Sequence, residues 1–115
     1  MIYAVLAVLV LFILGRLLAS RPDVSGTELE ELLKNGGKLV DVRTVSEFRS
    51  GHAGGALNLP LETLPGGMRN LDVSADTPIL LCCASGIRSS QAKKVLKKAG
   101  FTCVFNAGSI NSLER

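Results

Sequence analysis

The chain has 115 residues, a formal net charge of +3 and a hydrophobic fraction of 47%. This length accommodates one compact domain and one appendage, and it excludes two domains of ordinary size. From residue 22 onward eleven basic residues stand against ten acidic ones. That balance lacks the strongly basic face of a nucleic-acid-binding protein, so we exclude nucleic acid as a partner.

The N-terminal segment is apolar, and no charged residue precedes Arg16. A bilayer span needs roughly 20 apolar residues. Basic residues, Arg16 and Arg21, follow the apolar run, whereas a cleaved secretory signal begins with them. We therefore predict a transmembrane signal-anchor helix over residues 1–20, with the domain on the cytoplasmic side because positive residues mark that flank. The alternatives are a cleaved signal, which makes the domain periplasmic or secreted, and a core helix.

Residues 21–24 are predicted to be a linker and residues 25–115 the folded domain, because the proline of the linker disfavours helix just before it. Ser25 followed by Glu28 is the pattern of a capping box at the start of a helix. Leucines follow at helical spacing until Asn35, where two glycines end the helix.

Short apolar strands alternate with helices through the rest of the domain. The pattern predicts strands at 39–42, 56–59, 79–82 and 103–105, helices at 46–49 and 88–99, and a loop at 65–67. The run 79–82 is continuously apolar, as in strands buried on both faces of a parallel sheet. This alternation is typical of an α/β domain with a mainly parallel sheet.

The residues best suited to chemistry follow the strand 79–82. Cys83 is predicted at the carboxyl end of that strand, where α/β proteins bind ligands, and directly before a helix. The helix N-terminus favours an anion and lowers a thiol pKa. Gly86 permits a tight turn, and Arg88 adds a permanent charge suited to an oxyanion. The alternative is that Cys83 only packs, as most buried cysteines do.

The other cysteines, Cys82 and Cys103, are interpreted as packing residues. Three cysteines are an odd number for a disulfide framework, and adjacent cysteines rarely bridge each other. The chain has no CxxC pair, and His52 is its one histidine. We therefore predict free thiols and no metal site.

Two motifs resemble those of the rhodanese family. The first, Cys83-Ala-Ser-Gly-Ile-Arg-Ser89, resembles the family's active-site loop, C-x-x-G-x-R-S. The second resembles the signature D-V-R…E-F…G-H-x-x-G-A-x-N-x-P and comprises Leu39-Val-Asp-Val-Arg43, Glu47-Phe48, Gly51-His52 and Gly55-Ala-Leu-Asn-Leu-Pro60. The resemblance covers residues 25–108. It implies a rhodanese-like α/β fold with a mainly parallel five-stranded sheet flanked by helices.

The resemblance also implies a thiosulfate sulfurtransferase-type reaction. Cys83 would take a sulfane sulfur from thiosulfate or a persulfide donor, carry it as a persulfide, and pass it to a thiol or cyanide. No metal or organic cofactor is implied. The loop would bind substrate through its backbone N–H groups, at Ala84, Ser85, Gly86, Ile87 and Arg88.

Roles for three upstream residues follow from the same resemblance. Asp41 and Arg43 would support the loop, with Arg43 paired to Asp41 or to Glu47. His52 lies in a turn motif of the family, so a structural role is expected rather than that of a general base.

Some features depart from the family pattern. Ala84 stands where many thiosulfate-active members carry a basic or polar residue, which predicts weaker thiosulfate binding. The C-terminus lacks the usual second glycine and tryptophan, so a short closing helix is expected. Four residues separate Cys83 from Arg88, whereas the related phosphatases have five.

Two alternative functions belong to other classes. One is a binding module that recruits a partner protein to a membrane without turnover. The other is a thiol redox or persulfide carrier that uses Cys82 together with Cys83. A run of lysines on the last helix is interpreted as a solvated face, with contact to anionic lipid as the alternative: Lys93, Lys94, Lys97 and Lys98.

Overall fold

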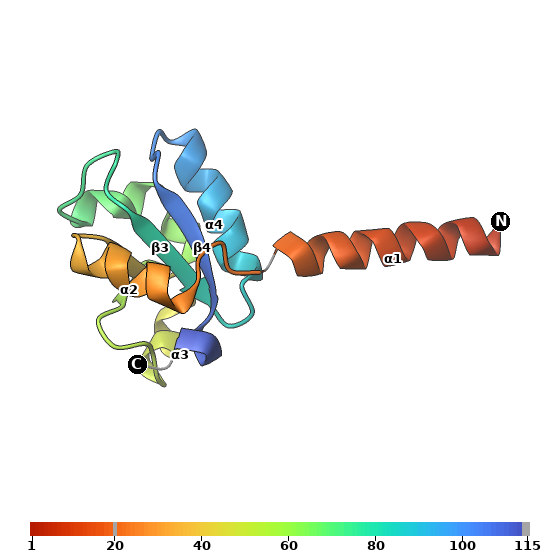
Figure 1. Ribbon diagram of the computed structural model, residues 1–115, viewed down its shortest axis with the longest axis horizontal. Coiled ribbons are helices and arrows are strands. Elements are labelled where there is room, and N and C mark those ends of the chain that lie inside the picture. The colour runs from red at the N-terminus through yellow and green to blue at the C-terminus, as the bar shows by residue number, and fades with distance from the viewer. Residues whose placement is uncertain (20, 114–115) are drawn as a thin grey trace.

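The computed structural model describes residues 1–19 and 21–113. An N-terminal helix, α1 (Ile2–Ala19), extends away from an α/β domain (Figure 1). Its side chains from Ile2 to Leu14 are about half exposed or more. The expectation of an N-terminal helix is therefore confirmed, and the alternative of a core helix is wrong.

The transmembrane prediction concerns α1. Among the described residues, no helix is both long enough and apolar enough to cross a membrane. The prediction of a transmembrane helix is not supported.

One parallel sheet forms the centre of the domain. Its strands are β1 (Lys38–Asp41), β2 (Leu57–Asn58), β3 (Ile79–Cys83) and β4 (Val104–Ser109), in the order β2-β1-β3-β4. Every neighbouring pair is parallel. The predicted α/β class with a parallel sheet is confirmed. The last strand begins after Cys103 and runs further than expected.

Four strands are present in residues 1–19 and 21–113, and the expectation of five was wrong. The linker beside β4 shows why. Asp23 donates its backbone N–H to the carbonyl oxygen of Asn106 at 2.8 Å, as a strand neighbour would. Pro22 has no N–H to extend such a ladder, and the Asp23 side chain instead accepts the N–H of Asn106 at 2.8 Å. Among the described residues, the linker therefore makes one backbone hydrogen bond to β4 and does not form a fifth strand.

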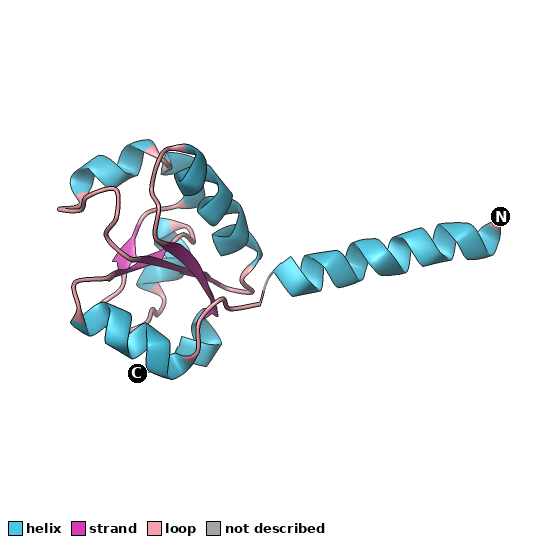
Figure 2. Ribbon diagram, turned by 45° about the horizontal axis from the view of Figure 1, so that its top comes forward, coloured by secondary structure: helices cyan, strands magenta, loops and turns pink. Residues whose placement is uncertain are grey.

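Helices cover both faces of the sheet (Figure 2). On one face lies α2 (Gly26–Lys34), whose Leu29 packs in an apolar cluster with Leu80 of β3. On the other lies α4 (Ile87–Lys98), whose Ala92 and Leu96 pack with Leu81. The residues of β3 are all fully buried, as its continuous apolar run predicts.

Capping boxes begin two of the helices. The predicted box at α2 is present, with Ser25 and Glu28 bonded reciprocally. A second box begins α3 (Val45–Arg49), where Thr44 and Glu47 bond in the same way. Short 3₁₀ helices are present at Leu61–Thr63, Gly66–Asn70 and Ile110–Leu113. The second of them overlaps the segment 65–67, which was expected to be a loop.

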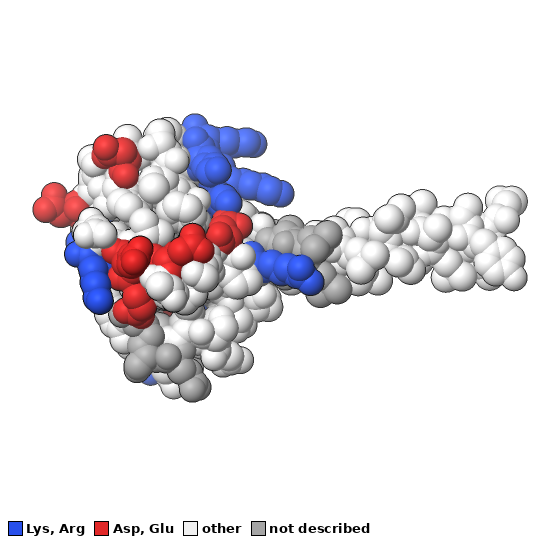
Figure 3. All heavy atoms as spheres, viewed as in Figure 1, with Lys and Arg blue, Asp and Glu red and all other residues white. Residues whose placement is uncertain are grey.

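Charged side chains are divided between the two helical layers. Basic groups gather over α4 and acidic groups over α2 (Figure 3). On α4, Lys94, Lys97 and Lys98 are exposed, which agrees with a solvated face. Lys93 differs, because its Nζ lies 2.5 Å from a carboxylate oxygen of Asp23 and ties the linker to α4.

Candidate active site

Cys83 is the last residue of β3 and stands at the carboxyl edge of the sheet. The chain then turns through Ala84 and Ser85 into α4, which begins at Ile87. Gly86 is the residue before that helix and has a φ of 91°, a left-handed conformation that glycine adopts without strain. The strand, turn and helix predicted from the sequence thus form the site.

The sulfur of Cys83 accepts a hydrogen bond from the turn and lies close to a hydroxyl of α4. The N–H of Gly86 points at Sγ from 2.9 Å, and Ser89 Oγ lies 3.5 Å from it. Burial of Cys83 tends to raise its pKa. Hydrogen bonds from the Ser89 hydroxyl and from the backbone of Ser89, Ser85 and Gly86 outweigh burial, so the pKa lies below the ordinary 9.0. The site favours the thiolate, which is the nucleophilic form.

A buried hydrogen-bond network between Ser89, Asn106 and Gly86 lies next to the sulfur. Ser89 Oγ lies 2.6 Å from Asn106 Oδ1 and 3.0 Å from the Gly86 carbonyl oxygen. Asn106 Nδ2 donates to that same carbonyl at 3.1 Å, and Asn106 Oδ1 accepts the N–H of Gly108 at 2.9 Å. A hydroxyl has one proton to donate. The Ser89 hydroxyl can therefore donate its one hydrogen bond either to Asn106 or to the sulfur, according to the charge on Cys83.

Asn106 was not among the predicted site residues. It lies on β4, 17 residues beyond Ser89. The signal in the sequence is a single amide within an otherwise apolar strand, Val104-Phe105-Asn106-Ala107. A buried polar group there needs a partner, but the sequence does not say which residue supplies it.

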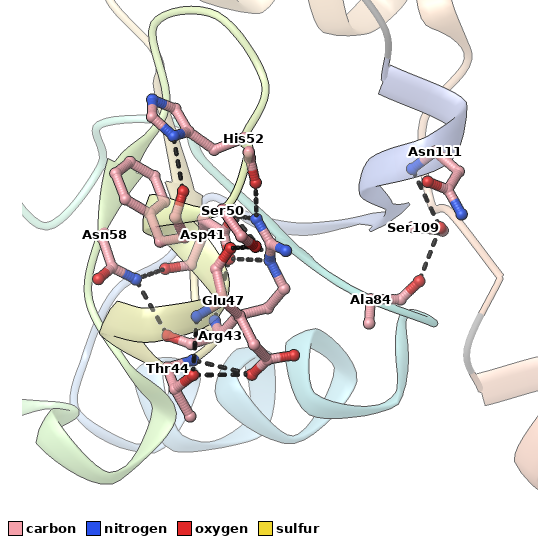
Figure 4. A network of polar contacts seen from close by, with 12 residues as sticks. Asp41, Arg43, Thr44, Glu47, Ser50, His52, Asn58, Ala84, Ser109 and Asn111 are labelled. Atoms are coloured by element: carbon pink, nitrogen blue, oxygen red, sulfur yellow. Dashed lines mark hydrogen bonds and ion pairs between the residues drawn. The ribbon is translucent and has the colours of Figure 1, made fainter.

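The remaining loop residues lie around the mouth of the turn. Ala84, Ser85 and Ile87 are exposed, whereas Gly86 is buried. The Ala84 carbonyl accepts the hydroxyl of Ser109 at 2.8 Å, a contact visible in Figure 4. The structure thus brings the predicted loop residues together around Cys83.

Asp41 and Arg43 form a buried ion pair at the carboxyl end of β1. Arg43 Nε lies 3.0 Å from both carboxylate oxygens of Asp41, and Nη2 lies 2.8 Å from Oδ2. Arg43 Nη2 also donates to the carbonyl of Gly51 at 2.7 Å. Asn58 Nδ2 donates to the backbone carbonyls of both residues (Figure 4). Of the two partners expected for Arg43, the structure shows Asp41.

Glu47 pairs instead with Arg88. Two parallel bonds join them, Nη1 to Oε1 at 2.7 Å and Nη2 to Oε2 at 2.9 Å. Chiefly the Arg88 hydrogen bonds, and then the backbone of Thr44, lower the pKa of Glu47 to about 2. Arg88 was expected to be available to a substrate oxyanion, but a carboxylate already occupies it. The Thr44-x-x-Glu47 capping pattern could have drawn attention to Glu47.

Comparison with known proteins shows which family the chain belongs to. The family model described as the rhodanese-like domain matches residues 25–115. The chain belongs to the rhodanese-like family. The resemblance expected from the two motifs is thereby confirmed.

Named relatives of this rhodanese-like chain include sulfurtransferases. It is 30% identical over 74 residues to the thiosulfate sulfurtransferase PspE of Escherichia coli K12, which covers 64% of the chain and 71% of PspE. It is 39% identical over 69 residues to the uncharacterized protein YqhL of Bacillus subtilis 168, covering 60% of the chain and 53% of YqhL. The chain thus spans about half the length of YqhL.

A solved structure shows the same fold. The human single-domain sulfurtransferase TSTD1 superposes with a TM-score of 0.67 at 30% sequence identity, covering 79% of the chain and 93% of TSTD1.

His52 lies in the turn after α3. Its ring stacks on Phe48 with centroids 3.7 Å apart, and Nδ1 lies 2.9 Å from the Phe48 carbonyl oxygen. These contacts fit the structural role expected of a turn residue. Among residues 1–19 and 21–113, no three His, Cys, Asp or Glu side chains gather closely enough to hold a metal ion.

Proposed function

We propose that this rhodanese-like chain is a sulfurtransferase that carries sulfane sulfur on Cys83. The observation that supports this most directly is the hydrogen bond of 2.9 Å from the Gly86 N–H to Cys83 Sγ, at the carboxyl end of β3 and in front of α4. Donors aimed at that point stabilise an anionic sulfur. Relatives named thiosulfate sulfurtransferase, including PspE, support the same reaction class.

In the first half-reaction the Cys83 thiolate attacks the outer sulfur of a small donor. A new S–S bond forms at Cys83, and the S–S bond of the donor breaks. The leaving group departs with the electron pair, as sulfite from thiosulfate or as a thiolate from a persulfide. Cys83 is left as a persulfide anion.

In the second half-reaction an acceptor takes the terminal sulfur. A thiolate or cyanide attacks it, and the Cys83 thiolate leaves and is ready for another donor. The turn binds the anionic sulfur through backbone N–H groups, those of Ala84, Ser85, Gly86, Ile87 and Arg88. Asp41 and Arg43 support the site by joining the end of β1 to the Gly51 segment through their ion pair and the bond from Arg43 to the Gly51 carbonyl. The two steps use no metal or organic cofactor.

Intact-mass measurement after incubation with a donor tests this function. Thiosulfate and cysteine persulfide would be offered separately to the wild type, Cys83→Ser and Cys82→Ser. We expect one added sulfur atom in the wild type and in Cys82→Ser, and none in Cys83→Ser. If neither donor adds sulfur to the wild type, the enzyme proposal is wrong and a binding module becomes the better interpretation.

A further inference from the structure

Ser109, the last residue of β4, reaches the active-site turn from the neighbouring strand. It lies opposite Cys83 in the register of β3 and β4. Its hydroxyl donates to the backbone carbonyl oxygen of Ala84 at 2.8 Å. Ser109 follows Gly108 at the position of the second glycine that the C-terminus lacks. Because glycine has no hydroxyl, the family pattern does not account for this bond.

The direction of the Ser109 hydrogen bond is fixed from both sides. Its Oγ accepts the backbone N–H of Asn111 at 3.2 Å, and the carbonyl oxygen of Ala84 can only accept. The single hydroxyl proton of Ser109 therefore points at Ala84, as Figure 4 shows. Ser109 is half-buried, so water competes with this contact less than it would on an open surface.

The carbonyl that Ser109 holds belongs to the peptide between Ala84 and Ser85. That peptide is trans, and the carbonyl and N–H groups of a planar trans peptide point in opposite directions. Holding the Ala84 carbonyl toward Ser109 therefore directs the Ser85 N–H away from Ser109 and into the turn. The backbone of Ser85 is one of the hydrogen-bond donors that lower the pKa of Cys83, so the sulfur lies on that side.

The peptide between Ala84 and Ser85 needs such a partner more than the rest of the turn does. Both of its residues are exposed, whereas Gly86 and Ser89 are buried. An exposed turn peptide is more mobile than the elements it connects. Ser109 lies on a strand of the sheet, and a rigid element positions a site more precisely than a loop does.

We propose that Ser109 is a positioning residue for the sulfur transfer: by holding the Ala84 carbonyl, it aims the Ser85 N–H at the sulfur that Cys83 carries. This inference rests on the proposed function and adds a residue of β4 to its machinery. Ser109 acts through the backbone of the turn and not through contact with the substrate. The aimed N–H stabilises the thiolate before the transfer and the anionic persulfide after it.

The pH dependence of alkylation at Cys83 in Ser109→Ala tests the inference. Without the hydroxyl the thiolate loses an aimed donor, so the profile should move to higher pH while the rate at its upper plateau is retained. A residue that only stabilised the fold would leave the midpoint in place. Below the midpoint, loading of Cys83 by cysteine persulfide should slow about threefold, the order of one net hydrogen bond. Intact mass follows the loading, and peptide mass spectrometry follows the alkylation.

The charged groups around the site are unchanged in this variant. The charge on Cys83 acts on Arg88 of α4. Asp41 and Arg43 of β1 act on the neighbouring Cys82. A shift of the Cys83 profile in Ser109→Ala therefore reports the orientation of the turn and not the loss of a charge.

Two further variants show whether the effect belongs to the Ser109 hydroxyl. Ser109→Thr restores a hydroxyl and should restore the wild-type profile. Ser112→Ala is the matched control, because it removes a hydroxyl bonded to the Ser109 backbone carbonyl at 2.7 Å and leaves the Ser109 side chain in place. It should alter neither alkylation nor loading.

Three results overturn the inference: a Ser109→Ala profile that coincides with the wild type, one that Ser112→Ala reproduces, or one that Ser109→Thr does not reverse. The sulfurtransferase stands in each case as long as the wild type is loaded. If neither thiosulfate nor cysteine persulfide loads the wild type, the proposed function itself has failed.

Discussion

Cys82 and Cys83 are adjacent in the chain and both are fully buried, yet their surroundings act on them in opposite directions. Cys82 belongs to the apolar cluster under α2, together with Leu29 and Ala107. Burial, and then the negative charges of Asp41 and Cys83, raise the pKa of Cys82 to about 12. Hydrogen bonds lower the pKa of Cys83 despite its burial.

The difference shows that burial alone does not make a thiol unreactive. Successive side chains of a strand point to opposite faces, so Cys83 belongs to the apolar cluster on the α4 side, where its sulfur also meets the N–H of Gly86. Cys83 is also the last residue of β3, so the backbone N–H groups of the following turn are not bonded within the sheet and one of them points at its sulfur. The contrast argues against a redox role that uses both cysteines.

Alkylation gives the largest expected contrast. With a pKa of about 12 for Cys82 and one below 9.0 for Cys83, the thiolate fractions at pH 7 differ by at least about a thousandfold. Iodoacetamide should therefore modify Cys83 and leave Cys82 untouched in the folded protein, as peptide mass spectrometry would show. Equal rates of modification would contradict the comparison.

The buried charges beside Cys82 can be tested by Asp41→Ala. Asp41 lies in register with Cys82 across the β1–β3 ladder. Its removal leaves the buried Arg43 charge without an anionic partner, although the bond to the Gly51 carbonyl remains, and should lower the free energy of unfolding by about 3 kcal/mol. Urea denaturation measures the change. The exposed control Glu31→Ala should shift it by less than about 0.5 kcal/mol. Should Asp41→Ala not fold, Asp41→Asn would serve, and a neutral effect in that variant would contradict the prediction.

On the Cys83 side, Ser89→Ala removes the hydroxyl that lies 3.5 Å from the sulfur. The thiolate loses a donor while burial still disfavours its charge, so the pKa of Cys83 should rise. Thiolate absorbance in the ultraviolet, measured against pH, reports the shift. Ser90→Ala, one residue further along α4, is the matched control. An unchanged titration in Ser89→Ala would show that the backbone donors suffice.

The smallest expected effect concerns the Glu47–Arg88 pair and its dependence on pH. The folded pKa of Glu47, about 2, lies below its ordinary 4.5. A depressed carboxylate pKa adds stability above the unfolded value, and that stability is lost as the pH falls toward the folded value. The wild type should therefore melt at a slightly higher temperature than Glu47→Gln above pH 4.5. The gap should close between pH 4.5 and about 2, as a melting series would show, and a gap independent of pH would rule out the ion pair as its source.

The main helices, the strands and the strand, turn and helix around Cys83 could be predicted from the sequence. The box at Ser25 and Glu28 involves residues three positions apart, and the apolar run 79–82 carries its periodicity within itself. Cys83 was identifiable for the same reason, because its strand, turn and helix are contiguous. Local patterns determine such features, since the interacting groups are neighbours in the chain.

Only the tertiary structure decided which distant side chains complete the site. Glu47 meets Arg88 across 41 residues, and Asn106 reaches Ser89 from another strand. The missing fifth strand likewise depends on how Pro22 and Asp23 lie along β4. These contacts depend on the register and packing of separate elements. The sequence shows that a carboxylate, an amide or a proline is present, but it does not show which distant residue each one contacts. By itself, then, the sequence determined the fold class and the turn that carries Cys83, and tertiary packing determined which distant side chains surround that turn.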